Sequence, residues 1–550
     1  MRGSRVVALS AAFSGTLGVA YLILPPMGSD LAAQVARAEF FAAHGPTLVD
    51  LRWYGGVQQF GYSLLAQPVM ALLGVRVTGA LALVAAATVF AALLVRTRVP
   101  RPLLGSLVGV VTIAGNLVSG RVTYGLGVAF GLVALLALTW RVGSDTNSSR
   151  GNTGASAGHA DRSGGDGARP SAADRWRPLA LAGAAALLAS ATSPVAGLFC
   201  GLAGVALLLS RRYTDGLTIA VAAALPLAVT ALLFGDGGWM NISRTDTVRA
   251  MVTALLVAAL IADRSVRVGA LLAAVGVVTA ALVHTPVGLN ATRLTTMFAL
   301  PVLAAAAREP AWLARPLRSG TFRPVMLVTL LAAVCWWQPP VVPADLRSIG
   351  DPASDPSYFA PLRAELDRRG VSGRLEVPPT RNYWEAARLG GIPLARGWLR
   401  QADIDRNPLF FTTVPGARGT GVPLTAESYR AWLSENAVQY VAVPDAPLSW
   451  VGRAEAELVS GGLPYLTEVW SARHWRLYGV VDPTPLVADP GELLRQDASS
   501  VTFRAVEASV VLVRIRHNPW LTVTGGATLA ADEQWTAVTV PRAGTYTLTG

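Results

Sequence analysis

The sequence predicts a polytopic α-helical membrane protein of about 11 spans, followed by a water-soluble region with an α+β part and a small β-sandwich. Of its 550 residues, 52% are hydrophobic and 15% are charged, and the mean hydropathy is +0.44. Soluble chains carry roughly 25% charged residues. From Ala344 onward the long apolar runs end. We therefore predict a transmembrane body over residues 1–343 and a soluble region after it.

Many of the apolar runs approach the length that crosses a bilayer, about 20 residues for an upright helix, and several shorter ones lie between charged loops. The predicted spans are Val6–Leu24, Val77–Val95, Leu103–Val118, Tyr124–Trp140, Leu179–Thr192, Val195–Leu209, Leu217–Phe234, Val248–Ala262, Val268–Val283, Leu294–Ala307 and Pro324–Val342. The stretch 141–177 is rich in Ser, Gly, Asp and Arg, which predicts a disordered cytoplasmic linker.

Arginine placement predicts the orientation in the cytoplasmic membrane. Arg2 and Arg5 precede the first span, and the loops after spans two, six, eight and ten also carry arginines. Positively charged short loops stay in the cytoplasm, so the C-terminal region is predicted to be extracytoplasmic. The short pair of spans around Ser193-Pro194 leaves an alternative, because a single long helix there would move the C-terminal region to the cytoplasm.

The composition excludes several functions. The net charge of +12 comes from arginine without lysine, and topology explains much of it, so we do not interpret it as a nucleic-acid signal. Cys200 and Cys335 both lie in apolar runs, which argues against a disulfide framework or a cysteine metal cluster. The sequence has no Walker loop and no His-Glu-x-x-His motif, so an ATP-driven pump is disfavoured.

Asp30 is the residue on which the functional hypothesis depends. It follows the first span and opens a polar, aromatic loop over residues 30–62, in which we expect two interfacial helices. The simpler interpretation is a helix N-cap. Arg37, Arg121 and Arg293 are predicted at outer mouths of spans, where the guanidinium fork suits phosphate. The alternative for these arginines is snorkelling toward lipid headgroups.

The layout resembles the GT-C superfamily of integral membrane glycosyltransferases, in which a catalytic Asp follows the first span, two juxtamembrane helices come next, and an extracytoplasmic domain often comes last. The C-terminal stretches resemble actinobacterial proteins of this kind. The stretches that carry the likeness are Gly28 to Gln34, Arg37 to Phe41, His44-Gly45, Trp53 to Gly56, Gly61 to Ser63, Tyr383 to Ala386, Leu394 to Trp398 and Tyr440 to Pro444.

The resemblance implies a glycosyltransferase that moves a sugar from a polyprenyl-phosphate donor to a cell-envelope glycan or lipid acceptor. Asp30 would be the general base, and Arg37, Arg121 and Arg293 would hold the donor phosphate. Many family members carry a paired acidic motif where Asp30 stands alone, so no metal ligand is assigned, and a divalent cation such as Mg or Mn remains possible.

The soluble region is predicted to divide into an α+β domain over 344–484 and a β-sandwich-like module over 485–550. Trp53, Tyr54, Arg396 and Trp398 are the expected acceptor contacts, although buried aromatic side chains more often belong to the core. Two alternatives to the enzyme remain open, a transporter or flippase of lipid-linked glycans and a non-catalytic envelope scaffold.

Overall fold

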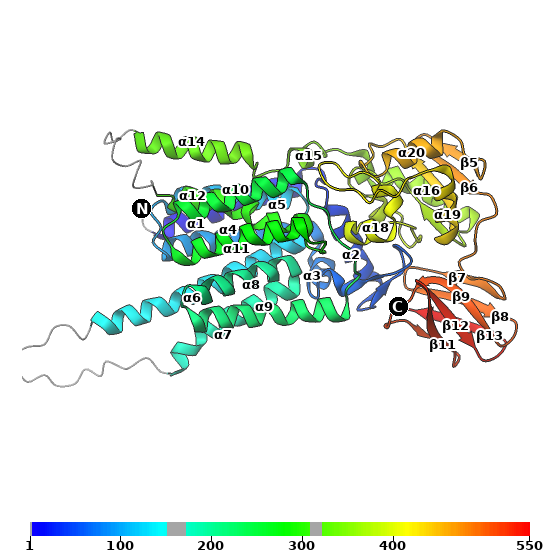
Figure 1. Ribbon diagram of the computed structural model, residues 1–550, viewed down its shortest axis with the longest axis horizontal. Coiled ribbons are helices and arrows are strands. Elements are labelled where there is room, and N and C mark those ends of the chain that lie inside the picture. The colour runs from blue at the N-terminus through cyan, green and yellow to red at the C-terminus, as the bar shows by residue number, and fades with distance from the viewer. Residues whose placement is uncertain (1–2, 151–171, 309–321) are drawn as a thin grey trace, which may run out of the picture.

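The computed structural model describes residues 3–150, 172–308 and 322–550. A helical bundle forms one end of the molecule, and the C-terminal region forms the other (Figure 1). Each predicted span coincides with a helix. These helices are α1 (Gly3–Ile23), α4 (Val75–Arg96), α5 (Pro102–Val118), α6 (Val122–Arg150), α7 (Ala172–Thr192), α8 (Pro194–Leu209), α9 (Tyr213–Leu233), α10 (Arg244–Leu260), α11 (Arg264–Leu282), α12 (Arg293–Ala306) and α14 (Phe322–Trp337).

Within the described ranges, five helices are long and apolar enough to cross a membrane, namely α1, α4, α6, α9 and α11. Three shorter apolar helices, α5, α8 and α14, accompany them. A membrane protein with several spanning helices is thus supported, while the count of about 11 spans stays a prediction. The predicted linker 141–177 is helical at both of its ends, in α6 and α7, and its residues 151–171 lie outside the described part.

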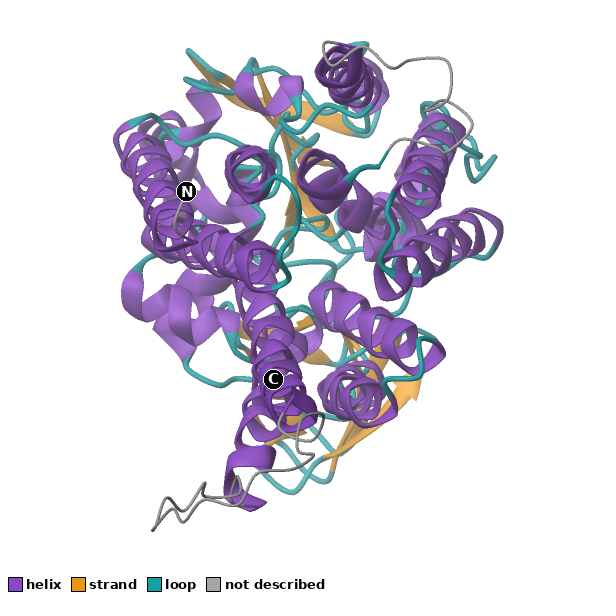
Figure 2. Cartoon of the chain, turned by 90° about the vertical axis from the view of Figure 1, so that its left-hand side faces the viewer, coloured by secondary structure: helices purple, strands orange, loops and turns teal. Residues whose placement is uncertain are grey.

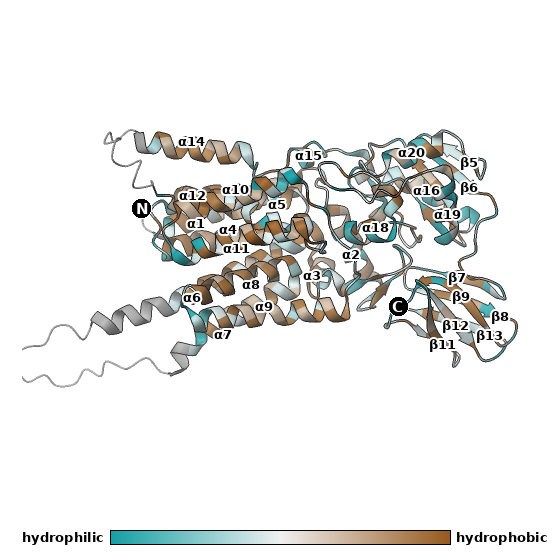
Figure 3. Cartoon of the chain, in the orientation of Figure 1, coloured by the Kyte–Doolittle hydropathy of each residue, from teal (hydrophilic) through white to brown (hydrophobic). Residues whose placement is uncertain are grey.

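Hydrophobic and polar residues are distributed unevenly along the long axis of the molecule. Hydrophobic residues dominate the bundle, and polar residues are more frequent in the C-terminal region (Figure 3). Arg101 donates to Ala304 O at 2.9 Å, Arg308 N donates to Leu260 O at 2.9 Å, and Arg264 donates to Leu209 O at 3.1 Å, so these basic loops share one end of the bundle. The C-terminal region covers the opposite end (Figure 1).

Helices α7 and α8 form a hairpin rather than one long helix. Leu179 and Ala182 of α7 share an apolar cluster with Leu207 of α8, which requires the chain to reverse between them. The side chain of Ser193 accepts a hydrogen bond from Ala196 N and caps α8, and Pro194 occupies the first helical turn, where it costs no helix hydrogen bond. Figure 2 shows the molecule from the bundle end, where several helices are seen along or close to their axes.

Helices α2 (Leu31–His44) and α3 (Ala66–Leu73) follow the first span, as the resemblance implied. Helix α2 does not lie open on the membrane surface. Leu31, Ala32 and Ala36 belong to one apolar core with residues of the C-terminal region, so α2 is enclosed between that region and the bundle. The short strands β1 (Val49–Asp50) and β2 (Val57–Gln58) pair between the two helices.

The first part of the C-terminal region has a mixed sheet in the order β3-β4-β6-β5, in which only β3 and β4 are parallel. Its strands are β3 (Arg374–Glu376), β4 (Val438–Pro444), β5 (Leu466–Ala472) and β6 (Trp475–Val480). Its helices are α15 (Pro343–Leu346), α16 (Pro356–Arg369), α17 (Glu385–Arg388), α18 (Arg400–Arg406), α19 (Ala426–Glu435) and α20 (Arg453–Ser460).

The last part has two antiparallel sheets, ordered β10-β13-β8-β7 and β11-β12-β9. The strands are β7 (Gly491–Gln496), β8 (Ser500–Ala505), β9 (Ser509–Arg516), β10 (Thr522–Val523), β11 (Thr528–Asp532), β12 (Trp535–Val540) and β13 (Gly544–Thr549). Val49 and Leu51 of the first loop join its apolar core. Because that core is shared, the β-sheet part is anchored to the segment that follows the first span.

Candidate active site

A cavity of about 890 Å³ lies where the bundle meets the C-terminal region. Its lining includes Asp30 at the start of α2, Arg121 between α5 and α6, and Arg293 at the start of α12. From the C-terminal region it includes Trp398 and Arg400. A cavity with an apolar body and a few converging charges is the usual form of a ligand site.

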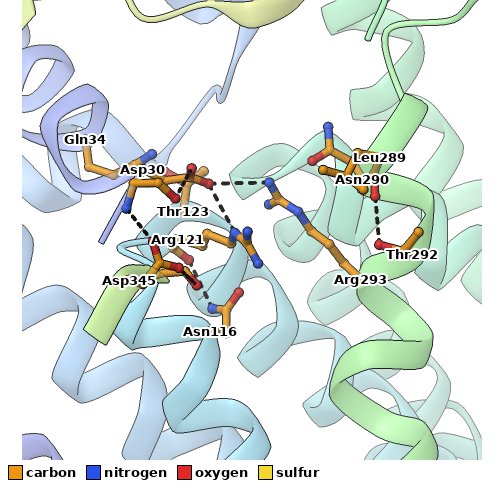
Figure 4. Close-up of polar contacts among 12 residues, drawn as sticks. Asp30, Gln34, Asn116, Arg121, Thr123, Leu289, Asn290, Thr292, Arg293 and Asp345 are labelled. Atoms are coloured by element: carbon orange, nitrogen blue, oxygen red, sulfur yellow. Dashed lines mark hydrogen bonds and ion pairs between the residues drawn. The ribbon is translucent and has the colours of Figure 1, made fainter. Parts of the chain in front are cut away.

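Asp30 lines this cavity and is 8% exposed. Its Oδ2 atom lies 3.2 Å from Arg121 Nε and 3.5 Å from Arg293 Nη2 (Figure 4). Asp30 occupies the N-cap position of α2, but its side chain makes no capping hydrogen bond. The simpler interpretation of Asp30 as a helix cap is therefore wrong for the side chain, which faces the two arginines instead.

The turn that carries Arg121 packs tightly against the segment that carries Asp30. Gly120 has a φ of 75°, and a Cβ atom there would lie 2.5 Å from Leu31 N. Gly28 has a φ of 101°, and its Cβ would lie 2.4 Å from Val118 O. Asp30 N donates to Ser119 O at 3.1 Å. Glycine is required at both positions because only glycine permits this backbone and this approach.

Asp345, at the start of the C-terminal region, binds both the segment that carries Asp30 and the turn that carries Arg121. The sequence prediction missed this residue. Its carboxylate accepts a hydrogen bond of 2.6 Å from Ser119 Oγ and one of 3.0 Å from Ser29 N. Figure 4 shows it beside Asp30 and Arg121. Asp345 is the first acidic residue after the last predicted span, which was the one signal available in the sequence.

Arg37 lines the cavity but makes no contact with Asp30. Its guanidinium carbon lies 4.5 Å from the centre of the Tyr62 ring, and the residue is 5% exposed. In the described part of the chain, no carboxylate forms an ion pair with Arg37 and its Nε atom has no hydrogen-bond partner. Burial lowers the pKa of its guanidinium, since the charged form loses solvation. By contrast, nearby Arg52 pairs with Asp50 at 2.7 Å.

Trp398 is the one predicted acceptor residue that reaches the cavity, and its Nε1 donates to Ser29 O at 3.0 Å. The prediction that Trp53, Tyr54 and Arg396 contact an acceptor is wrong in this structure. Trp53 and Tyr54 are each 1% exposed, and Leu399 N donates to the Tyr54 hydroxyl at 3.2 Å. These side chains fill the interface behind Trp398 and so hold it in place.

Arg396 is buried for an electrostatic reason. Its guanidinium lies 2.8 Å from Asp403, 3.1 Å from Glu455 and 3.6 Å from Glu376. A guanidinium surrounded by carboxylates in the interior of a domain is a structural ion-pair network. The charge of Arg396 is therefore compensated inside the domain that presents Trp398, and Arg396 does not line the cavity.

The site residues do not fit a divalent cation. Asp30 shares its Oδ2 between two guanidinium groups, and the neighbouring Asp345 carboxylate accepts hydrogen bonds from Ser119 Oγ and Ser29 N. Over residues 3–150, 172–308 and 322–550, no group of three or more His, Cys, Asp and Glu side chains is arranged to hold a metal ion. Positive charge at this centre is supplied by arginine.

Fold and site together define a multi-helix membrane protein with an acid–arginine centre in a cavity beneath a soluble region. The sequence matches no protein-family model and no curated protein sequence. Among solved structures, the arabinofuranosyltransferase AftD from mycobacteria is 18% identical, with a TM-score of 0.44 and coverage of 87% of this chain and 40% of that one. A mutant of AftD gives 18% identity, a TM-score of 0.48, and coverage of 89% and 42%.

ArnT from Cupriavidus metallidurans, bound to undecaprenyl phosphate, is 14% identical with a TM-score of 0.44. That match covers 86% of this chain and 98% of ArnT. The chain thus spans about two fifths of the length of AftD and nearly all of ArnT. These values describe a likeness and do not assign an activity.

Proposed function

We propose that the protein is a membrane glycosyltransferase of the GT-C kind. It moves a sugar from a polyprenyl-phosphate donor to a glycan or lipid acceptor of the cell envelope, on the outer face of the cytoplasmic membrane. The observation that carries this proposal is the Asp30 carboxylate held between Arg121 and Arg293 in a cavity that borders both the apolar bundle and the soluble region.

The charges at the centre suit a lipid phosphate. The cavity lining carries six arginines, among them Arg37, Arg121 and Arg293, and four aspartates, so its net charge is positive. A phosphodiester donor carries one negative charge, and the phosphate left after transfer carries up to two. The arginines therefore bind the leaving group more strongly than the donor, which lowers the barrier to breaking the sugar–phosphate bond.

Donor binding also frees the base. With an empty cavity, Arg121 and Arg293 use Asp30 as their counterion. A donor phosphate competes for the same guanidinium groups and leaves the carboxylate to accept a proton. The acceptor oxygen then attacks C1 of the sugar, and the C1–O bond to phosphate breaks. The electron pair leaves with the lipid phosphate, the acceptor proton passes to Asp30, and the configuration at C1 inverts.

The distribution of arginines supports the proposed sidedness. The arginine-bearing loops lie at the bundle end opposite the cavity and the C-terminal region (Figure 1). The positive-inside rule then favours an extracytoplasmic cavity. Polyprenyl-phosphate sugars displayed on the outer leaflet would have their phosphate at the depth of this cavity and their isoprenoid chain beside the apolar helices.

The experiment is sugar transfer by purified protein in nanodiscs, supplied with radiolabelled polyprenyl-phosphate sugars and a cell-envelope glycan extract. We expect Asp30→Asn to reduce product formation at least about 100-fold, as loss of a general base does. Glu39→Gln is the matched control, since Glu39 lies on the same helix with a side chain 53% exposed and outside the cavity lining. Full activity of Asp30→Asn would refute the assignment.

Proteoliposomes distinguish the other two functions. If labelled lipid crosses the bilayer and no glycosidic bond forms, the protein is a flippase. If neither product nor lipid movement is detected with any donor, the scaffold interpretation replaces the enzyme.

A further inference from the structure

The wall of the cavity that belongs to the C-terminal region carries a second cationic centre, built on Arg400. Its Nη2 atom donates to the Tyr383 hydroxyl at 3.2 Å. Its guanidinium carbon lies 5.4 Å from the centre of the Trp450 ring and 5.9 Å from that of Tyr383. All three residues line the cavity. Aromatic faces beside a guanidinium fix its orientation and leave its remaining N–H groups available.

Arg400 differs from neighbouring arginines because its charge is not compensated. Arg396 lies among three carboxylates, and Arg406 pairs with Asp236 at 3.6 Å. In the ranges that the structure describes, no carboxylate lies within ion-pair distance of Arg400. Arg381, also on the cavity lining, likewise forms no ion pair there. An oriented, uncompensated guanidinium in a cavity is suited to an anion.

The segment that presents Tyr383 is held in an unusual conformation. Tyr383 has a φ of 60°, which bulky residues rarely adopt. The Thr380 hydroxyl donates to Glu385 at 2.6 Å and accepts from Trp384 N at 3.1 Å, so buried hydrogen bonds fix the turn on both sides of Tyr383. Backbone strain of this kind persists where the surroundings enforce it, often beside a ligand site.

The Arg400 centre is close to Asp30 but separate from the donor arginines. Trp398 Nε1 binds Ser29 O at 3.0 Å, one residue before Asp30. Arg400 follows Trp398 by two residues, so their Cα atoms are at most about 7 Å apart. The donor arginines belong to α2, α12 and the α5–α6 turn, whereas Arg400 begins α18 in the soluble region. A molecule that occupies both centres must extend out of the membrane end of the cavity.

We propose that Arg400, oriented by Tyr383 and Trp450, binds an acidic group on the acceptor, so that the acceptor is a saccharide bearing a phosphate or carboxylate rather than a neutral glycan. This inference rests on the proposed function, because the acceptor must approach Asp30 from the soluble side. The donor phosphate is held by the arginines at the membrane end, and the acidic group of the acceptor is held by Arg400.

Binding measurements test this subsite without requiring transfer. The probes are maltotriose, maltotriose carrying one phosphate monoester, inorganic phosphate and undecaprenyl phosphate, each titrated against the full chain in nanodiscs by calorimetry. We expect the phosphorylated trisaccharide to bind at least about tenfold more tightly than maltotriose, the size of effect that one charge-assisted contact supplies. Arg400→Gln should abolish this preference and leave undecaprenyl phosphate affinity unchanged.

Arg473→Gln is the control, since Arg473 is an exposed arginine of the same region and lies outside the cavity lining. Tyr383→Phe removes the hydroxyl that orients Arg400 and should reduce the preference partially. Three results would overturn the proposal. They are equal affinity for both trisaccharides, equally tight and Arg400-dependent binding of inorganic phosphate alone, and loss of undecaprenyl phosphate binding in Arg400→Gln, which would assign this cation to the donor.

The two proposals fail separately. If the protein prefers the phosphorylated trisaccharide but transfers no sugar, the subsite for an acidic group is supported and the glycosyltransferase proposal is refuted. If the protein transfers sugar to neutral glycans and shows no Arg400-dependent preference, the glycosyltransferase proposal is supported and the acidic acceptor is refuted.

Discussion

Ser119 Oγ and Asp345 Oδ2 are joined by a hydrogen bond of 2.6 Å, although 226 residues separate them in the chain. Ser119 lies in the turn that carries Arg121, and Asp345 lies in α15, where the C-terminal region begins. The same carboxylate accepts a hydrogen bond from Ser29 N, next to Asp30. One buried carboxylate therefore helps to set the spacing between Asp30 and Arg121.

Asp345→Asn should lower kcat with little change in KM for the donor. An amide can keep only part of the hydrogen bonding of a carboxylate, so the turn and the Asp30 segment lose their common anchor. We expect a loss of about 10- to 100-fold, as small displacements of catalytic groups produce. Steady-state transfer kinetics measure it, with Glu468→Gln, at an exposed position of β5, as control. An unchanged kcat in a folded Asp345→Asn protein would remove the positioning role.

Arg293→Gln and Arg293→Lys should separate charge from geometry at the donor phosphate. The glutamine variant is expected to weaken undecaprenyl phosphate binding by at least about tenfold, since a charge-assisted contact is lost. The lysine variant keeps the charge but cannot form the bidentate hydrogen bonds of a guanidinium, so it should recover only part of the affinity. Equilibrium binding in nanodiscs measures both. If the two variants bind like the wild type, Arg293 serves only Asp30.

Gly120→Ala should destabilise the protein more than Gly370→Ala does. The two glycines have similar φ angles, 75° and 71°, so both variants bear the left-handed backbone cost of about 1–2 kcal/mol. A Cβ at Gly370 meets nothing within 4 Å, whereas one at Gly120 lies 2.5 Å from Leu31 N. Gly120→Ala should therefore lower Tm further and also reduce transfer. Equal shifts in Tm would show that the turn can move away from α2.

The sequence predicts the convergence of Asp30, Arg121 and Arg293 because each follows or precedes an apolar run on the same predicted side. Span ends on one side of a membrane lie at one depth, so topology alone brings these residues near each other. The same logic cannot say which arginine reaches Asp30, and Arg37, the nearest in sequence, makes no contact with it. Which arginine lies beside Asp30 depends on the orientation of α2 about its own axis relative to the bundle.

The predicted acceptor contacts agree less well with the structure, for a physical reason. Trp53, Tyr54 and Arg396 have the composition of a polar-aromatic binding surface, yet all three are buried where the first loop meets the C-terminal region. An interface between two parts of one chain uses the same side chains as a ligand site. The role of Asp345 becomes recognisable only in the fold, and only the fold distinguishes Arg396, which is paired with carboxylates, from Arg400, which lines the cavity.

Two buried glutamates predict how stability depends on pH. Glu376 and Glu455 are both 0% exposed and share Arg396 as their cation, with Asp403 beside them. Burial raises the pKa of Glu376 well above its usual range, and the negative charge of Glu455 raises it further. Burial also raises the pKa of Glu455 to about 7. At least one of these carboxyls is therefore protonated in the folded protein at slightly acidic pH.

The folded protein should accordingly be more stable at pH 5 than at pH 8. A glutamate with a raised folded-state pKa keeps a proton that the unfolded chain releases near pH 4.5, so its contribution is complete below that pH and is lost as the pH rises through about 7. Glu376→Gln replaces the protonated form with an amide and should flatten this decline in Tm, measured by thermal unfolding in detergent. Part of the decline should remain, because burial also raises the pKa of Glu385 to about 7. Exposed Glu468→Gln is the control, and wild-type and Glu376→Gln curves that run parallel from pH 5 to pH 8 would contradict a shared proton in this cluster.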